Sequence, residues 1–192
     1  TAMIAVQGPK VISMVEKFSK EIPALKRYRF AIKNLVVTKL IVSRTGYTGE
    51  DGVEVILPAS MVGFALKMIL QGLDMKSADA AVKPIGLGAR DTLRMEASMP
   101  LYGHELGEEI NALSSGVDFA ISLDKDQMER GERFVGMDAL QKTMREGGPA
   151  RKLVGMQFDG KRAARQGNVI KIGDSEVGVV TSGCLSPTLE KV

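Results

Sequence analysis

The segment Ser43-Arg44-Thr45-Gly46-Tyr47-Thr48-Gly49-Glu50-Asp51-Gly52-Val53-Glu54-Val55 decides how the chain is interpreted. Glycine recurs at every third position between two apolar runs, which suggests a phosphate-binding loop at first sight. No Gly-Lys-Ser/Thr follows, and the segment leads into a strand, so no helix N-terminus faces an anion. The pattern therefore predicts two strands joined by a glycine-rich turn.

Glu54 is the residue of this segment that a plain turn does not explain. Side chains alternate along a strand, so Val53, Val55 and Leu57 share one face while Glu54 and Ile56 share the other. A carboxylate on a half-buried face needs a partner, and its two oxygens match a planar ligand with two adjacent N–H donors, such as the edge of a pterin or guanine. From the spacing alone, a turn without any ligand stays open as the alternative.

The regions around this segment alternate between strand and helix patterns. An apolar stretch, 2–6, precedes Pro9, which is suited to the start of a helix. β-branched and aliphatic residues make 30–42 extended, and apolar residues at helical spacing predict helices from Ser60 and from Gly86 or Leu87 to Ala97. The first part of the chain is therefore predicted to be α+β.

The pattern of apolar residues is interrupted at Glu146-Gly147-Gly148-Pro149, a cluster of residues that break helices and strands. We place a domain boundary there, with an α+β portion over 1–146 and the start of an all-β domain over 147–192. Three short strands are expected at 153–158, 169–172 and 177–181, which are too few to close a barrel. The chain also starts inside an apolar stretch without Met, so we interpret it as lacking both ends of a larger protein.

A second candidate site lies in Pro84-Ile85-Gly86-Leu87-Gly88-Ala89-Arg90-Asp91-Thr92-Leu93-Arg94-Met95-Glu96. A dinucleotide fingerprint is rejected, because Asp91 stands where the third glycine belongs and would repel a pyrophosphate. Arg90 and Arg94 lie one helical turn apart, either as a cationic edge for an anion or as a solvated face that pairs with neighbouring carboxylates. His104 is interpreted as a loop residue, because no second histidine or cysteine stands near it to bind a metal.

Composition excludes several classes of protein. A single cysteine, Cys184, cannot form an intrachain disulfide, which favours a reducing compartment. The net charge of +3 does not call for a nucleic-acid partner, and no apolar run approaches the length of a membrane span. A basic cluster within 151–165 has only Phe158 as an aromatic neighbour and is interpreted as a solvated surface.

Taken together, these motifs resemble the aminomethyltransferase, or T-protein, of the glycine cleavage system. The segments that carry the resemblance are Val6-Gln7-Gly8-Pro9, 43–54, 88–96, Leu101-Tyr102-Gly103 and 178–189. The resemblance implies an α+β fold with a ferredoxin-like portion, followed by an incomplete barrel or jelly-roll-like β domain. These parts would surround a central hole that holds tetrahydrofolate.

The resemblance also implies a site and a reaction. Glu54 matches the family's pterin-recognising glutamate and Arg90 its folate-contacting arginine, while Tyr47 and Tyr102 would be wall residues. The enzyme transfers an aminomethyl group from the lipoyl arm of H-protein to tetrahydrofolate, its co-substrate, and releases ammonia without a metal. No catalytic residue is expected within this chain, because the family's aspartate would lie before residue 1, and we expect the chain alone to be inactive. The implied compartment is the bacterial cytoplasm or the mitochondrial matrix.

Two relatives remain as alternatives. Folate-binding proteins that support iron-sulfur assembly without catalysis carry a Lys-Gly-Cys-Tyr-type signature, whereas Cys184 lies in Thr181-Ser182-Gly183-Cys184-Leu185. Folate-dependent demethylase domains are the other alternative. The run Met99-Pro100-Leu101-Tyr102-Gly103-His104-Glu105 is more similar to the glycine-cleavage branch.

Overall fold

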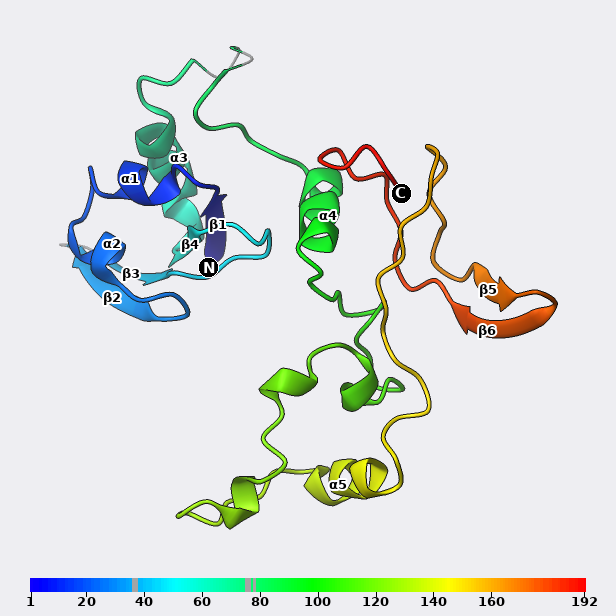
Figure 1. Ribbon diagram of the computed structural model, residues 1–192. Coiled ribbons are helices and arrows are strands. Elements are labelled where there is room, and N and C mark those ends of the chain that lie inside the picture. The colour runs from blue at the N-terminus through cyan, green and yellow to red at the C-terminus, as the bar shows by residue number, and fades with distance from the viewer. Residues whose placement is uncertain (36–37, 75–76, 78) are drawn as a thin grey trace. The chain divides into compact units, whose positions relative to one another are not determined.

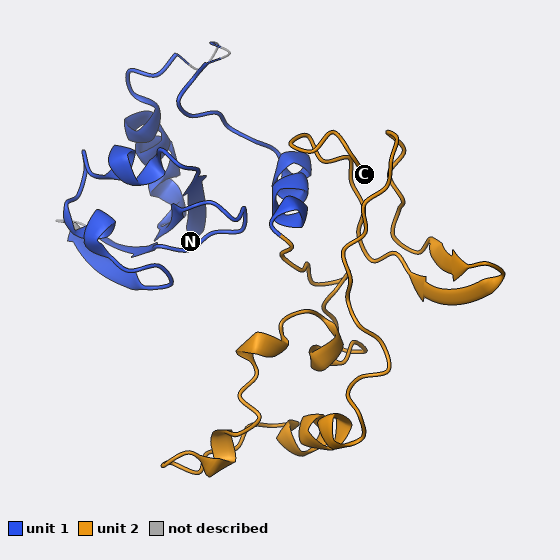
Figure 2. Cartoon of the chain, viewed as in Figure 1, with its two compact units in different colours: residues 1–97 blue, residues 98–192 orange. Residues whose placement is uncertain are grey.

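The computed structural model describes residues 1–35, 38–74, 77 and 79–192. The chain divides into two compact units, Thr1–Ala97 and Ser98–Val192 (Figure 2). Each unit is described by itself.

Unit 1 contains a four-stranded antiparallel sheet (Figure 1). Its strands are β1 (Ala2–Gln7), β2 (Phe30–Leu35), β3 (Thr38–Ser43) and β4 (Gly52–Leu57), in the spatial order β1-β4-β3-β2. β4 is a central strand, and Glu54 is paired with Ala5 on one side and Ser43 on the other. The register therefore places Glu54 between two small residues on the same face of the sheet.

One face of this sheet forms the core of the unit. Helices α1 (Val11–Val15) and α2 (Glu21–Ala24) supply Val11 and Ile22, which pack with Val42 of β3 and Val53 of β4. All four side chains are buried, as strand alternation predicts for this face. α1 starts two residues after Pro9, close to the start that the sequence predicts.

The opposite face carries Glu54 among apolar side chains. Ile56 lies two residues along the same strand, paired with Ile41 of β3 and Met3 of β1. Met3 is 56% exposed, and Phe30 and Ile32 of β2 are exposed on this face as well. Glu54 itself is half-buried, as the sequence predicts. Around Glu54 this face is apolar, and the exposed Asn34 and Lys39 are paired farther along it.

The remaining helices of unit 1 lie close to where the sequence predicts them. The 3₁₀ turn η1 (Ala59–Met61) leads into α3 (Val62–Leu70), and α4 covers Leu87–Glu96. The stretch 30–42, predicted to be extended, contains β2 and the start of β3, and these two strands pair antiparallel. The sequence has no glycine or proline between these strands, so no turn signal was available there; residues 36 and 37 lie outside the described residues.

Unit 2 begins with short turns of helix. They are η2 (Ala112–Ser114), η3 (Asp118–Ala120) and η4 (Lys125–Gln127), followed by helix α5 (Met137–Arg145), which the sequence analysis did not predict. The buried side chains of the described part of this unit are Glu105, Leu113, Ser115, Met137 and Ser186.

The last part of unit 2 holds a β-hairpin of β5 (Val169–Ile172) and β6 (Ser175–Val179). The strand expected at 153–158 is wrong: the backbone there has only isolated hydrogen bonds, from Leu153 N–H to the Ser114 carbonyl and between Phe158 and Val192, so it lacks a ladder. Two strands do not close a barrel, which agrees with the expectation of an incomplete β domain. No helix in the described part of the chain is long and apolar enough to cross a membrane.

Candidate functional site

A salt bridge closes the base of the loop between β3 and β4. The guanidinium of Arg44 donates from Nε to Asp51 Oδ1 over 3.1 Å and from Nη2 to Asp51 Oδ2 over 2.6 Å. Its Nη1 also donates to the carbonyls of Pro23 and Leu25 over 3.0 and 2.7 Å. Arg44 therefore ties the loop to the chain just before and after the end of α2.

This salt bridge also changes the ionisation of its two members. The hydrogen bond from Arg44 lowers the pKa of the Asp51 carboxyl; burial opposes this, and the N–H of Gly52, 2.9 Å from Asp51 Oδ1, lowers the pKa further. The same hydrogen bond raises the pKa of Arg44. Both groups are held in their charged forms, so the loop base is a fixed ion pair.

The amide of Gln7, at the end of β1, holds the interior of the loop. Its Nε2 donates to the carbonyls of Thr45 and Val53 over 3.1 and 3.2 Å. A Cβ on Gly46 would lie 1.9 Å from Gln7 Oε1, and a Cβ on Gly52 would lie 2.4 Å from it. A side chain at Gly46 would displace the Gln7 amide, and one at Gly52 would also meet the Val6 carbonyl at 2.6 Å, which is a structural reason for glycine at both positions.

Thr45 links this loop to the carboxylate of Glu54. Its Oγ1 donates to Glu54 Oε2 over 2.5 Å and lies 2.8 Å from Ser43 Oγ. Glu54 Oε1 has no donor among the residues that the structure describes. The carboxylate is thus held from one side and keeps acceptor capacity for a ligand.

Arg90 and Tyr47, both predicted to contact a ligand, lie together. The guanidinium of Arg90 on α4 lies over the ring of Tyr47, 4.8 Å from its centroid. The loop and the end of α4 are also close elsewhere, because a Cβ on Gly49 would lie 2.8 Å from Ala97 Cβ. In Figure 1 the loop after β3 extends toward α4.

The two arginines of α4 differ in burial and in partners. Arg94 is buried, and its Nε donates to Asp91 Oδ1 over 2.8 Å within the helix. Arg90 is exposed and has no carboxylate partner in the described ranges. Only Arg90 therefore keeps its fork of donors available for a ligand.

Tyr102 and His104 belong to unit 2. Tyr102 is 68% exposed, and its role as a wall residue stays a prediction. His104 lies in a loop, as predicted, where its Nδ1 is 3.0 Å from both the Thr181 carbonyl and Ser182 Oγ. It connects two segments of unit 2 that are distant in sequence.

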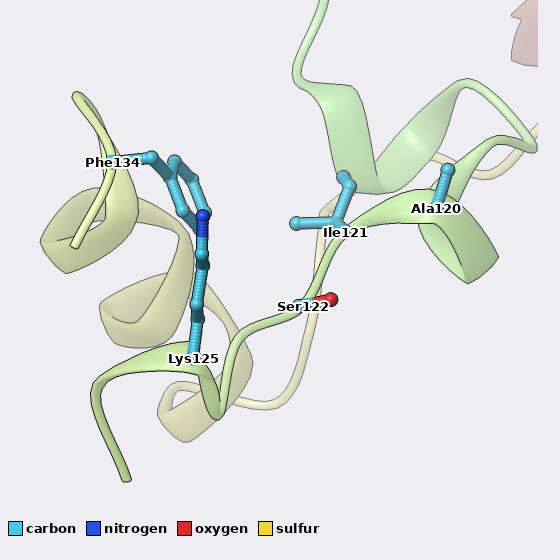
Figure 3. Close-up of a pocket in the computed structure, with 5 residues that line it drawn as sticks. All are labelled: Ala120, Ile121, Ser122, Lys125 and Phe134. Carbon is cyan, nitrogen blue, oxygen red and sulfur yellow. The ribbon is translucent and has the colours of Figure 1, made fainter. Parts of the chain in front are cut away.

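A pocket of about 370 Å³ also lies in unit 2, lined by Ala120, Ile121, Ser122, Lys125 and Phe134 (Figure 3). Lys125 is paired with Glu132 over 3.3 Å. None of the predicted site residues lines this pocket. Across the described ranges, no group of three or more His, Cys, Asp and Glu side chains is arranged to hold a metal ion.

Sequence reasoning missed the residues that support Glu54. Thr45, Gln7 and the pair of Arg44 and Asp51 were not assigned roles, although all stand within or beside the segments that decided the interpretation. The available signal was the pair of opposite charges at the two ends of the glycine-rich turn, 44 and 51. The contact from Gln7 spans 38 residues to Thr45 and had no local signal.

Two protein families have sequence models that match this chain. The GCVT N-terminal domain matches residues 1–125, and the glycine cleavage T-protein C-terminal barrel domain matches residues 151–192.

Curated relatives and a solved structure agree with these matches. An aminomethyltransferase of Rubrobacter xylanophilus is 44% identical over 98% of the chain and 47% of its own length, and one of Symbiobacterium thermophilum is 41% identical over 99% and 49%. The crystal structure of glycine cleavage system aminomethyltransferase T from Bartonella henselae has a TM-score of 0.82 at 26% identity, over 98% of this chain and 48% of that one. The chain spans about half the length of these relatives.

Proposed function

Because the chain belongs to the glycine cleavage T-protein family, we propose that it supplies the pterin-recognising part of a tetrahydrofolate-dependent aminomethyltransferase. In a chain of full family length, the enzyme transfers the aminomethyl group from the lipoyl arm of H-protein to tetrahydrofolate. The products are 5,10-methylenetetrahydrofolate, ammonia and the reduced lipoyl arm. No metal takes part, and we assign the activity to the bacterial cytoplasm or the mitochondrial matrix.

The position of Glu54 carries this proposal. Its carboxylate stands on an apolar sheet face, half-buried, with Oε2 held by Thr45 and Oε1 without a donor among the described residues. A pterin ring presents N3–H and the 2-amino group side by side, and a carboxylate accepts both. Ile56, next to Glu54 on the same face, offers an apolar contact to a planar ring. The residues present therefore fit the edge of a pterin.

Arg90 and Tyr47 form the second part of the proposed folate site. The ring of Tyr47 orients the guanidinium by a contact of 4.8 Å, which leaves its planar donors for an anionic or carbonyl group of folate. Tyr102 is proposed as a further wall residue. Within residues 1–192 we assign no catalytic group, and the organisation into 1–146 and 147–192 is part of the proposal.

These residues bind and orient folate in our proposal, and they perform no proton transfer. Aminomethyl transfer requires the folate nitrogen beside the thioaminal carbon, and holding two reactants in that geometry supplies a large part of catalysis. A pterin fixed by two parallel hydrogen bonds has one rotational orientation in the site. The contribution of Glu54 is therefore positional.

The test is tetrahydrofolate-dependent release of ammonia from aminomethylated H-protein, measured with a chain of full family length that contains residues 1–192. We expect Glu54→Gln to raise the KM for tetrahydrofolate, whereas Glu50→Gln, an exposed carboxylate of the same loop, leaves it unchanged. Equal KM values for the parent and Glu54→Gln would contradict the proposed site.

A further inference from the structure

We infer that Thr45 is a positioning residue for Glu54, which its hydroxyl holds in the orientation that receives the ligand. The inference rests on the proposed function of Glu54 and adds a residue to it. Thr45 touches no proposed ligand atom and acts through the carboxylate.

The direction of the hydrogen bonds follows from the chemistry of the three groups. An ionised carboxylate only accepts, so the proton between Thr45 Oγ1 and Glu54 Oε2 belongs to Thr45. A hydroxyl has one proton, and Thr45 therefore accepts from Ser43 Oγ, 2.8 Å away. The order of donation is Ser43 to Thr45 to Glu54, and the Glu54 carbonyl, 3.4 Å from Ser43 Oγ, is a second acceptor for the Ser43 proton.

The backbone that carries Thr45 is held independently of its side chain. Gln7 Nε2 donates to the Thr45 carbonyl over 3.1 Å, and Arg44, the preceding residue, is tied to Asp51 and to the carbonyls of Pro23 and Leu25. The Thr45 hydroxyl is thus presented from a loop that is fixed on both sides. A hydroxyl placed in this way limits the rotation of the carboxylate that it holds.

The arrangement leaves the acceptor capacity that a ligand needs. Each carboxylate oxygen has two lone pairs, and Thr45 uses one of the two on Oε2. Oε1 is without a donor among the described residues, so both oxygens can still accept from parallel N–H groups. The hydroxyl therefore orients Glu54 without competing for the ligand.

The experiment is calorimetric titration of tetrahydrofolate into a chain of full family length. Thr45→Val keeps the shape of the side chain and removes its proton donor, and we expect binding to weaken about tenfold, the equivalent of one lost hydrogen bond to a charged group. Thr45→Ser retains the hydroxyl and is expected to bind within about twofold of the parent. Circular dichroism shows whether each variant is folded.

A second background separates positioning from a general structural role. In Glu54→Ala, where residue 54 has no side-chain oxygen for Thr45 to hold, adding Thr45→Val is expected to change affinity no further. The same tenfold loss in both backgrounds, or parent affinity for a folded Thr45→Val, would overturn the inference. If Thr45→Val does not fold, Thr45→Ala takes its place, since alanine also lacks a proton donor, and parent affinity for a folded Thr45→Ala would overturn the inference equally.

Failure of the proposed function gives a different result. If Glu54→Gln binds tetrahydrofolate like the parent, Glu54 is not the pterin contact and the proposed function fails. If Glu54→Gln loses affinity while Thr45→Val does not, the proposed function stands and only the role of Thr45 is refuted.

Discussion

Replacing Asp51 by asparagine tests whether the salt bridge at the base of the loop stabilises unit 1. Asparagine keeps the shape and one acceptor oxygen but removes the charge that faces Arg44 Nε and Nη2. Hydrogen bonds to charged groups contribute about 1.5 to 3 kcal/mol each. The two side chains are 18% and 29% exposed, so water competes, and Arg44 keeps its two backbone carbonyls. We expect the free energy of unfolding to fall by about 1 to 2 kcal/mol near neutral pH.

The pH dependence of this loss makes the prediction specific. The hydrogen bond from Arg44 holds the pKa of Asp51 in the folded protein below its ordinary value, so the salt bridge stabilises the fold above that ordinary value. This stabilisation is lost as the pH falls through the folded pKa, because the carboxyl is then protonated in both states. The difference in free energy of unfolding between the parent and Asp51→Asn should reach its full size above about pH 5 and decrease as the pH is lowered.

The assay is urea unfolding followed by circular dichroism at a series of pH values. Asp79→Asn is the matched control, because Asp79 is an exposed carboxylate of the same unit without an ion pair among the described residues. The reasoning would be refuted if the parent and Asp51→Asn differed in free energy of unfolding by the same amount at every pH. It would also be refuted if they did not differ near neutral pH.

Three further predictions concern the loop, helix α4 and the chain as a whole. Arg90→Lys should weaken tetrahydrofolate binding although it conserves charge, because lysine cannot offer a planar fork of donors; unchanged calorimetric affinity would return Arg90 to the solvated helix face. Gly46→Ala should lower the free energy of unfolding by about 1 to 3 kcal/mol, because the new Cβ displaces the Gln7 amide from its two carbonyls. Gly63→Ala in α3 has open space around it and should not lower the free energy of unfolding. Equal free energies of unfolding for the two variants, measured with urea, would contradict this prediction. Residues 1–192 alone should release no ammonia from aminomethylated H-protein, because no catalytic group is assigned there; turnover equal to that of a chain of full family length would show that one is present.

Periodicity predicted the parts of the fold whose physics is local. α4 covers Leu87–Glu96 against an expected end at Ala97. Strands were expected at 169–172 and 177–181, separated by Gly173-Asp174-Ser175-Glu176, and the structure shortens this turn to Gly173-Asp174. The face of Glu54 followed from strand alternation alone. Such features depend on neighbours within a few residues.

Features set by distant contacts were missed or wrong. Leu153–Phe158 has the composition of a strand, but its ladder needs a partner strand that sequence pattern cannot supply. The omission of α5 has a different cause, because Met137, Leu140 and Met144 stand at helical spacing and this local signal was overlooked. The hydrogen bonds from the Gln7 amide to the Thr45 and Val53 carbonyls depend on the pairing of β1 with β4, which no local spacing reveals.

The proposed contact between Glu54 and the pterin edge is tested most directly by changing both partners. Tetrahydrofolate and its 2-desamino analogue, which lacks one of the two proposed donors, are titrated into the parent and Glu54→Ala in a chain of full family length. We predict that Glu54→Ala weakens tetrahydrofolate binding by about 2 to 4 kcal/mol, and that removing the 2-amino group weakens binding to the parent but hardly affects the variant. Equal losses from the 2-amino deletion in both proteins would contradict the account, because they would show that Glu54 does not contact that edge.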